Sequence, residues 1–347
     1  MTERNARNAA NAGTNAGAAR IASQAAITAI GSYVPDRVIT NADLERMVDT
    51  DDEWIVRRTG IQERRQASAD QYTSDLAILA IRDLFRRYPG DPGEVDAILV
   101  ATTTPDMPCP SVASRVQQAI GAARCFAADV SAACAGFVSA LQLANGLILS
   151  GAYRKVLVVG AETLTKITDY TDRSTCILFG DGAGAVLLER AEEGALLASN
   201  AVTDGSGGFQ VYATGLSQAG DGSPLAGEGK LVQNGREVYK WALSTVPDGV
   251  LQLLGALGAE VGDVDWFVPH SANLRMIEAI CERLGLPAER ALQSVTPYGN
   301  TSAASIPLAL DLAVQAGKLS PGQLIVLYGF GSGLTQAGLA VRWSINS

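Results

Sequence analysis

Two glycine-rich segments in different halves of the chain follow the same pattern. FGDGAGAVLLER (179–190) and FGSGLTQAGLAVR (330–342) each begin with a glycine-rich turn, continue into an apolar strand and end in arginine. This repeat predicts a molecule of two similar halves packed together, in which each segment closes one half. The boundary between the halves is expected near residues 192–200, after the acidic turn Glu192-Glu193-Gly194. Neither segment has G-x-G-x-x-G spacing between a strand and a helix, so a dinucleotide site is poorly supported.

From Ile27 onward, short apolar runs alternate with amphipathic stretches, which predicts an α/β protein. VDAILVATTT (95–104) and RKVLVVGAET (154–163) are typical of buried strands, and SDLAILAIRDLFRRY (74–88) is typical of a helix. We expect a parallel sheet covered by helices, with functional side chains where strands end. A length of 347 residues accommodates two such halves, which we assign to residues 27–195 and 196–347.

Charge and composition exclude several classes of protein. The formal net charge is −9, so the basic surface that nucleic-acid binding requires is not indicated. The five cysteines show no paired spacing, so we expect no disulfide framework and no metal site, and a reducing, cytoplasmic location fits best. No run approaches the ~20 apolar residues of a membrane span, so no membrane insertion is expected. Residues 1–26 are rich in Ala, Asn and Gly and lack the apolar centre of a secretory signal. A flexible extension is the preferred interpretation, ahead of a partner-binding tail.

Cys134 lies in CFAADVSAACAGFVSALQLANGLILSG (125–151), which predicts an apolar strand, a turn of small residues and a helix. A thiol at the start of a helix meets free N–H groups and the positive end of the helix dipole, which favour the thiolate. The other cysteines are interpreted as small buried apolar residues. Cys134 is therefore the candidate nucleophile.

His270 is the only histidine of the chain, and it lies in VDWFVPHSANLRMIEAICERLG (264–285) between a predicted strand and a predicted helix. Pro269 ends the strand and the helix begins at about Ser271, so His270 is expected at the turn, outside the apolar side of the helix. Asn300 lies at a similar turn in SVTPYGNTSAASIPLALDLAVQAG (294–317). By itself Asn300 is explained as a turn or N-cap residue.

The three side chains would form a coherent site where the halves meet. A cysteine exchanges acyl groups with thioesters, and neutral histidine and asparagine side chains donate hydrogen bonds to a thioester oxygen as negative charge develops on it. No general base is needed if loss of CO₂ generates the carbanion.

The sequence from about Ile27 to Trp343 resembles the β-ketoacyl-acyl carrier protein synthase III family. The resemblance rests on five motifs in order: NADLERMVDTDDEWIVRRTGIQERR (41–65), DVSAACAGF (129–137), FGDGAGAV (179–186), VPHSANLR (268–275) and YGNTSAAS (298–305). It implies a thiolase-like fold, in which two similar βαβαβαββ halves form a layered αβαβα sandwich. It also implies condensation of an acyl-CoA with malonyl-acyl carrier protein, in a homodimer that needs no cofactor because acyl-CoA is a substrate.

The resemblance assigns roles to individual residues. The catalytic triad falls on Cys134, His270 and Asn300, the backbone N–H groups of Cys134 and Ser332 form the oxyanion hole, and Phe330 supports the triad. The implied CoA-binding residues are Trp54, Arg58, Thr59, Arg173, Gly235 and Asn273, with adenine stacked between Trp54 and Arg173. The implied carrier-protein docking residues are Lys240, Arg275 and Arg283. Glu282 stands where a basic residue is frequent, which predicts a weaker or rearranged docking patch.

Three departures from the family pattern separate this chain from the acetyl-specific members. Cys109 occupies a place where phenylalanine reaches into the partner's pocket in well-studied members, and Ser271 and Thr335-Gln336-Ala337 also differ from the acetyl-specific type. The smaller Cys109 predicts starters longer or more branched than acetyl.

Other functions use overlapping residue types. The nearest alternative is a related acyltransferase, or a condensing enzyme of a secondary-metabolite pathway, because its triad and CoA site would look the same. A degradative thiolase is disfavoured because no cysteine follows Cys281, and a papain-like hydrolase because its CGSCW-like context is absent. An inactive scaffold protein fits least well, since all three catalytic side chains are present.

Overall fold

The computed structural model describes residues 17–220 and 222–345, which form two five-stranded sheets. The first sheet has the strand order β2 (Ala25–Tyr33), β8 (Asp181–Arg190), β7 (Lys155–Thr163), β5 (Ala97–Ala101) and β6 (Phe126–Val130). The second has the order β1 (Ala19–Arg20), β9 (Leu196–Thr203), β16 (Thr335–Arg342), β15 (Leu324–Gly331) and β14 (Trp266–Pro269). The chain passes from one sheet to the other between Arg190 and Leu196.

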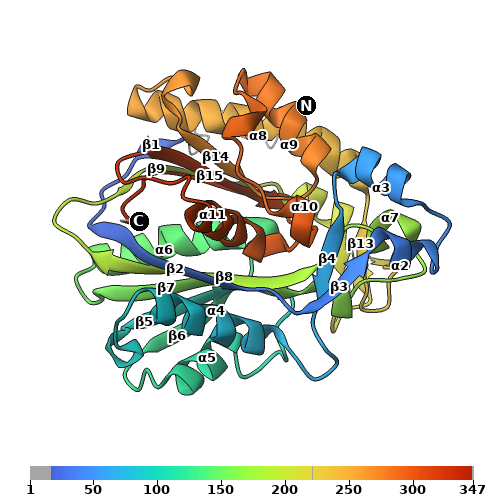
Figure 1. Cartoon of the computed structure of the whole chain (residues 1–347), viewed down its shortest axis with the longest axis horizontal. Coiled ribbons are helices and arrows are strands. Elements are labelled where there is room, and N and C mark those ends of the chain that lie inside the picture. Colours follow the sequence, from blue (N-terminus) through green and yellow to red (C-terminus); the bar gives the residue numbers. More distant parts are fainter. Residues whose placement is uncertain (1–16, 221, 346–347) are drawn as a thin grey trace, which may run out of the picture.

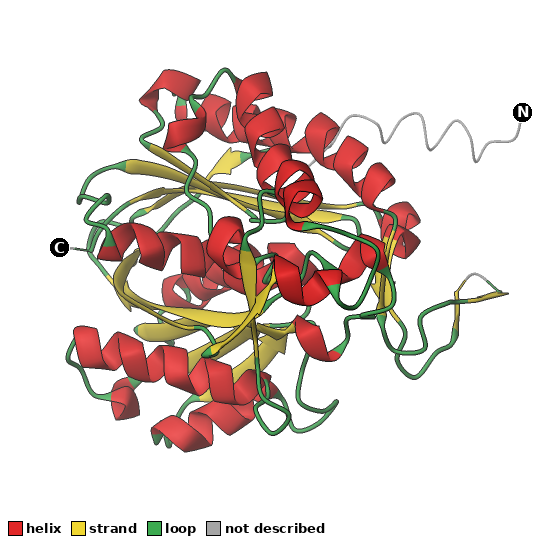
Figure 2. Cartoon of the chain, turned by 45° about the vertical axis from the view of Figure 1, so that its right-hand side comes forward, coloured by secondary structure: helices red, strands yellow, loops and turns green. Residues whose placement is uncertain are grey.

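Helices lie on both faces of each sheet and produce the layered αβαβα sandwich that was predicted (Figures 1 and 2). One outer layer contains α4 (Thr73–Arg87) and α5 (Val112–Ile120), and the other contains α8 (Gly235–Leu257) and α9 (Leu274–Leu284). The middle layer is formed by α6 (Gly136–Leu149) and α11 (Ser305–Gln315). The largest apolar core surrounds this middle layer, where Phe137 and Leu141 of α6 are packed together with Leu310 of α11.

Shorter elements form the end of the molecule that carries the cavity described below. They are the paired strands β3 (Arg37–Thr40) and β4 (Glu63–Gln66), β10 (Val211–Ala213) and β13 (Leu231–Gln233), and β11 (Ala219–Gly220) and β12 (Ser223–Pro224), with helices α2 (Asn41–Glu45), α3 (Asp52–Thr59), α7 (Arg173–Cys176) and α10 (Val295–Tyr298). The segment with β11 and β12 extends away from the body (Figure 2).

The two halves have the same strand pairing, which confirms the duplication predicted from the glycine-rich repeat. β8 and β16, which contain most of the repeated segments, each lie between an antiparallel outer strand and an antiparallel inner strand. β7 pairs with β5 in parallel, as β15 does with β14. Ala291 makes a parallel bridge with Phe267 at the place that β6 occupies in the first half.

The expectation of a parallel sheet was wrong in part, because both sheets are mixed. Only Ser332 to Leu334 separate β15 from β16. A parallel neighbour requires a crossover of a dozen or more residues, so this short connection forces an antiparallel pair.

Part of the predicted extension 1–26 belongs to the two sheets. Ala19 and Arg20 already pair with Ser199 and Ala198 of β9, and β2 begins at Ala25. The Arg20 guanidinium donates to the carbonyl oxygen of Leu257 at 2.7 Å, near the end of α8. Residues 1–16 lie outside the described residues.

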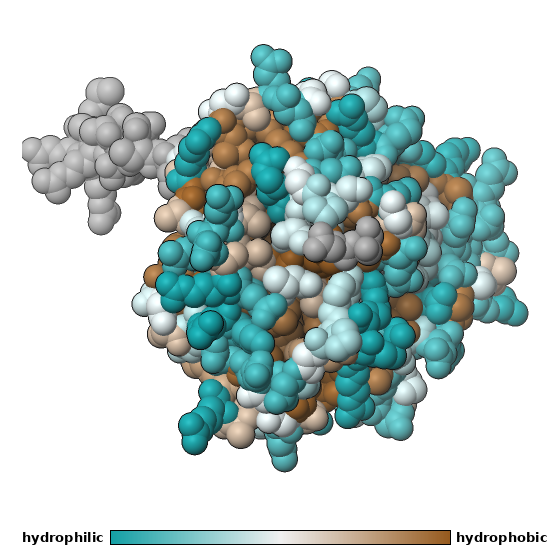
Figure 3. Space-filling view, turned by 60° about the vertical axis from the view of Figure 1, so that its left-hand side comes forward, coloured by the Kyte–Doolittle hydropathy of each residue, from teal (hydrophilic) through white to brown (hydrophobic). Residues whose placement is uncertain are grey.

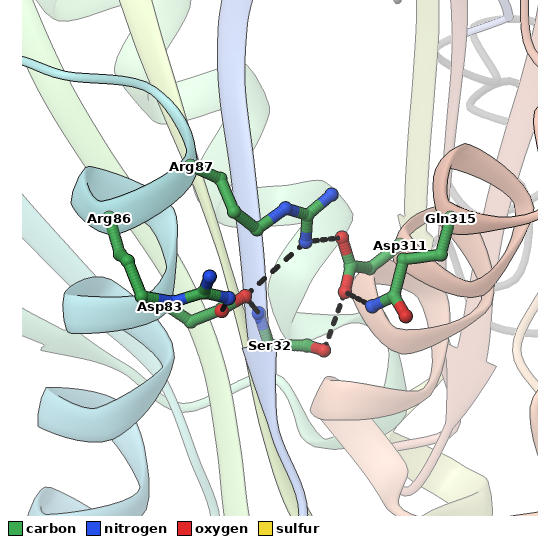
Figure 4. Close-up of polar contacts among 6 residues, drawn as sticks. All are labelled: Ser32, Asp83, Arg86, Arg87, Asp311 and Gln315. Atoms are coloured by element: carbon green, nitrogen blue, oxygen red, sulfur yellow. Dashed lines mark hydrogen bonds and ion pairs between the residues drawn. The ribbon is translucent and has the colours of Figure 1, made fainter.

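A cluster of polar side chains connects the outer helix α4 to the middle helix α11 across β2 (Figure 4). Asp311, which is 1% exposed, accepts hydrogen bonds from Ser32 Oγ at 2.6 Å and from Gln315 Nε2 at 2.7 Å, and it forms an ion pair with Arg87. Arg87 also contacts Asp83, whose carboxylate accepts from the backbone N–H of Ser32 at 3.2 Å. This charged contact joins α4 of the first half to α11 of the second half.

Hydrophilic side chains cover much of the face seen in Figure 3, and apolar side chains are visible in the gaps between them. Among the described residues, no helix combines the length and the apolar character needed to cross a bilayer.

Candidate active site

Cys134 lies in the 3₁₀ turn η2 (Ala133–Ala135) between β6 and α6. Ala133 has φ = 46°, a left-handed conformation that is strained for a residue with a side chain. The backbone of β15 packs directly on this turn: a Cβ added at Gly331 would lie 3.0 Å from Cys134 Sγ, and one at Gly329 would lie 2.7 Å from Ala135 Cα. Glycine is therefore required here so that a strand of the second half can reach the thiol of the first.

The thiolate expected at Cys134 is not favoured in the free protein, which corrects the prediction from the helix start. The pKa of Cys134 is raised to about 12, chiefly by burial and to a lesser extent by Glu162, although a hydrogen bond with Ser302 lowers it. Glu162 is 0% exposed, and its carboxylate accepts from the backbone N–H groups of Thr103 and Thr104. This buried carboxylate was not predicted, because it comes near the thiol only when β7 and β5 are paired.

His270 follows β14 and is held from several sides. Its backbone N–H donates to the carbonyl oxygen of Tyr328 at 2.8 Å, and Nδ1 lies 2.8 Å from Ser305 Oγ. The imidazole meets the Phe330 ring edge-on, with centroids 5.4 Å apart and planes at 73°. The residue is 2% exposed, so it is buried at its turn, and burial lowers its pKa to about 3. The ring is therefore neutral near pH 7 and offers one hydrogen-bond donor.

Asn300 belongs to the second half but is fixed by backbone bonds to the first. Its N–H donates to Leu178 at 2.8 Å, and its carbonyl oxygen accepts from Gly180 N–H at 3.0 Å. Its Oδ1 accepts from the backbone N–H of Ser302 at 2.9 Å. Within residues 17–220 and 222–345, Nδ2 forms no hydrogen bond, so this amide group is available to a bound molecule.

One cavity of about 1330 Å³ is lined by Cys134, His270 and Asn300 together with Phe330 and Ser332. The three side chains predicted separately from three turns therefore share one space between the halves. A thiol and two neutral donors in one cavity suit the formation of an acyl-cysteine and the stabilisation of a negatively charged oxygen.

Two family models match the sequence. One is described as 3-oxoacyl-[acyl-carrier-protein (ACP)] synthase III and matches residues 128–205, and the other, its C-terminal part, matches residues 254–343. β-Ketoacyl-[acyl-carrier-protein] synthase III 2 of Bacillus subtilis is 57% identical over 324 residues, which cover 93% of this chain and 100% of that protein. The chain belongs to this family. The protein of the same name from Halalkalibacterium halodurans is 55% identical over 324 residues, covering 93% of this chain and 98% of the relative. The synthase III structure from Thermus thermophilus superposes with a TM-score of 0.89 at 47% identity, over 92% of this chain and 99% of that one.

Most of the predicted CoA-binding residues line the same cavity. Trp54, Arg58, Thr59, Gly235 and Asn273 line it, whereas Arg173 lies just outside the lining. The Arg173 guanidinium lies 4.8 Å from the centre of the Trp54 ring, and that of Arg58 lies 5.5 Å from it. Two stacking distances of about 3.5 Å do not fit between Trp54 and Arg173, so Arg173 must move for a base to enter. The Thr59 hydroxyl donates to the Ile55 carbonyl and accepts from the Ile61 N–H, so its hydrogen bonds stabilise the C-terminal end of α3.

The predicted docking residues differ in how their charges are used. Lys240 is exposed at the cavity and pairs with Glu237 at 2.7 Å. Arg275 pairs with Glu278 at 2.8 Å and also donates to the Arg57 carbonyl at 3.1 Å, so it joins α9 to α3. Arg283 does not line the cavity, and it donates to the Leu243 carbonyl of α8 at 2.7 Å.

Several residues of the site were missed by the sequence analysis. Arg57 and Arg236 add positive charge to the cavity lining, and the Arg57-Arg58 doublet was the available signal. Ser302 lines the cavity, and Ser305 contacts His270.

Cys109, which was predicted for the acyl pocket of the partner, is exposed and does not line the cavity of its own chain.

Proposed function

We propose that the chain catalyses the decarboxylative condensation of an acyl-CoA with malonyl-acyl carrier protein to give 3-oxoacyl-acyl carrier protein, CO₂ and CoA, and so initiates fatty-acid synthesis. The observation that carries the proposal is that Cys134, neutral His270 and Asn300 share one cavity. The high identity to proteins named β-ketoacyl-[acyl-carrier-protein] synthase III 2 supports it. No cofactor is needed for these steps.

In the first step, the Cys134 sulfur attacks the acyl-CoA carbonyl carbon. The backbone N–H groups of Cys134 and Ser332 stabilise the charge on the carbonyl oxygen. The carbon–sulfur bond to CoA then breaks, and the thiol proton of Cys134 is transferred to the departing CoA sulfur. Because burial holds the Cys134 proton tightly, its loss must accompany the attack.

In the second step, malonyl-acyl carrier protein replaces CoA in the cavity. His270 and Asn300 donate hydrogen bonds to its thioester oxygen, which accumulates negative charge as the bond to CO₂ breaks. The carbanion attacks the acyl carbon, the bond from that carbon to Cys134 breaks, and the sulfur regains a proton from water. No group has to remove a proton from carbon, which agrees with a histidine whose pKa is lowered by burial so that it is a weak base.

Binding of the two large substrates is assigned to the cavity mouth. We propose that Trp54 and Arg173 separate to stack on the adenine of CoA, with Arg58 and Thr59 nearby. Gly235 and Asn273 are proposed to lie along the pantetheine tunnel. Lys240, Arg275 and Arg283 remain proposed contacts for the acidic carrier protein. The pairing of Lys240 and Arg275 with carboxylates supports a weak, salt-sensitive interaction.

A homodimer is proposed from the edge of the first sheet. β6 is one of the two edge strands of this sheet, and its Phe126 is 48% exposed although its ring packs near Tyr153. An exposed edge with an apolar side chain is a template for pairing with a second copy. In such a dimer, Cys109 would face the partner's acyl pocket, and its small side chain favours starters longer or more branched than acetyl. Light scattering tests the dimer, and initial rates that fall steadily from acetyl-CoA to longer starters would contradict the pocket proposal.

The reaction is tested by intact-mass measurement with a panel of acyl-CoAs, using the wild type and Cys134→Ser. We expect the mass to increase by one acyl group in the wild type only. CO₂ release from malonyl-acyl carrier protein should then depend on prior acylation. His270→Ala should retain acylation and lose condensation. Absence of acylation with every CoA, or equal loss of both steps in His270→Ala, would overturn the proposal.

A further inference from the structure

The Nδ1 ring nitrogen of His270 is hydrogen-bonded to Ser305, the first residue of α11. Ser305 Oγ lies 2.8 Å from His270 Nδ1, and Ser305 is 0% exposed. The same Oγ accepts a hydrogen bond from the backbone N–H of Ser271 at 3.3 Å. The hydroxyl therefore lies between a backbone donor and the imidazole.

The direction of the Ser305–His270 hydrogen bond follows from counting protons. A hydroxyl has one proton to donate, and the Ser271 N–H already supplies Oγ with a donor. Among the described residues, Nδ1 is the one acceptor found for the Ser305 proton. The reverse arrangement, with Nδ1–H donating, would leave that proton without an acceptor in a fully buried place, which is unfavourable. The Ser305 hydroxyl thus donates, Nδ1 accepts, and the ring proton of the neutral imidazole lies on Nε2.

Two further serines hold Ser305 in this position. Ser294 Oγ donates to the Ser305 carbonyl at 3.0 Å, and Ser294 N–H donates to Ser271 Oγ at 3.0 Å. Ser271 and Ser294 are also 0% exposed. Ser271, Ser294 and Ser305 form a closed set of buried contacts next to Nδ1 of the imidazole.

We propose that Ser305 is a positioning residue that fixes His270 as its Nε2–H tautomer, so that the ring presents a donor, and not a lone pair, to the substrate oxygen. The identity of that oxygen rests on the proposed function, but the tautomer does not. An Nδ1–H ring would place a lone pair opposite a developing negative charge and would repel it.

The single histidine makes the tautomer directly measurable. Protein labelled with ¹⁵N-histidine gives one pair of ring nitrogens in a long-range ¹H–¹⁵N spectrum. We expect the protonated nitrogen of the wild type to be Nε2 and that of Ser305→Ala to be divided between both positions. Decarboxylation of malonyl-acyl carrier protein should fall about tenfold in Ser305→Ala, the factor that corresponds to one neutral hydrogen bond, while the rate of Cys134 acylation stays unchanged.

Ser305→Thr and Ser294→Ala are the matched variants. Ser305→Thr keeps the hydroxyl and should restore the Nε2–H tautomer, and Ser294→Ala removes an equally buried hydroxyl that does not touch the ring and should leave the tautomer unchanged. A wild-type ring protonated at Nδ1 would overturn the proposal, even if the variants fail to fold. An unchanged tautomer in Ser305→Ala would overturn it as well. If no condensation is detected but the tautomer changes as expected, the proposed function fails and the role of Ser305 stands.

Discussion

Acidification should destabilise the protein through His270, and replacing this residue by glutamine isolates the effect. Burial lowers the pKa of His270 from its ordinary 6.5 to about 3. Below 6.5 the unfolded chain binds a proton at this residue that the folded chain cannot bind. The contribution to stability is therefore complete above the unfolded pKa and is lost as the pH falls from 6.5 toward 3.

The size of the loss follows from the width of this window. Each pH unit inside it costs about 1.4 kcal/mol, so a fall to about pH 4.5 removes about 2.7 kcal/mol of unfolding free energy. Carboxylates such as Asp181, whose pKa burial raises to about 6, titrate in the same range. Glutamine at position 270 is neutral at every pH and leaves those carboxylates in place, so the difference between the two proteins reports His270 alone.

Urea unfolding at equal protein concentration provides the measurement, with wild type and His270→Gln compared at about pH 7.5 and about pH 4.5. The wild type should lose more stability than the variant by about 2–3 kcal/mol. Equal losses in the two proteins would refute the argument that His270 is neutral because it is buried.

Three further outcomes follow from contacts in the structure. Arg87→Met should cost about 3–5 kcal/mol of unfolding free energy because it leaves Asp311 buried without its cation, and Arg87→Met/Asp311→Leu should recover most of this loss in urea unfolding. A single-variant cost below about 1 kcal/mol would show that this ion pair does not hold the halves together. Gly331→Ala should slow acylation of Cys134 by about 10- to 100-fold, measured by mass, because the added methyl group displaces a thiol 3.0 Å away; a normal rate in the folded variant would contradict this. Arg173→Ala should raise the KM for acyl-CoA about fivefold and leave that for an acyl-pantetheine unchanged, and an equal change for both would argue against adenine stacking.

The sequence was sufficient for features that depend on local pattern. The glycine-rich turns before β8 and β16 indicate the duplication because each is a short continuous stretch of sequence. Cys134, His270 and Asn300 were predicted at turns that precede helices for the same reason. The mixed character of the sheets was not predicted, since strand pairing joins residues that are distant in the chain.

The charges of the site were the least predictable part. The pKa of Cys134 depends on Glu162 from β7 and on the strand that covers the thiol, and a helix start by itself indicates the opposite direction. Arg275 matches a docking position in the sequence, yet its guanidinium donates to the Val56 and Arg57 carbonyls of α3. Such contacts join segments that no local motif connects, so a motif identifies the residue but not its partner.

The duplication also explains why the chemistry divides between the halves. η2 before α6 and η7 (Ser302–Ala304) before α11 are equivalent turns, they contact one another, and each has a left-handed residue, Ala133 and Ser302, both with φ = 46°. A strained non-glycine residue costs about 1–3 kcal/mol, so the strain is maintained twice by the surrounding packing. In the first half the turn presents the Cys134 thiol. In the second half Ala303 stands at the equivalent position, and the loop before it presents Asn300. Two contacting copies of one turn thus present different side chains to the cavity, and under the proposed function one supplies the acylated cysteine and the other a hydrogen-bond donor to the substrate oxygen. Substitution of Ala303 by cysteine would add a second thiol without adding a second site.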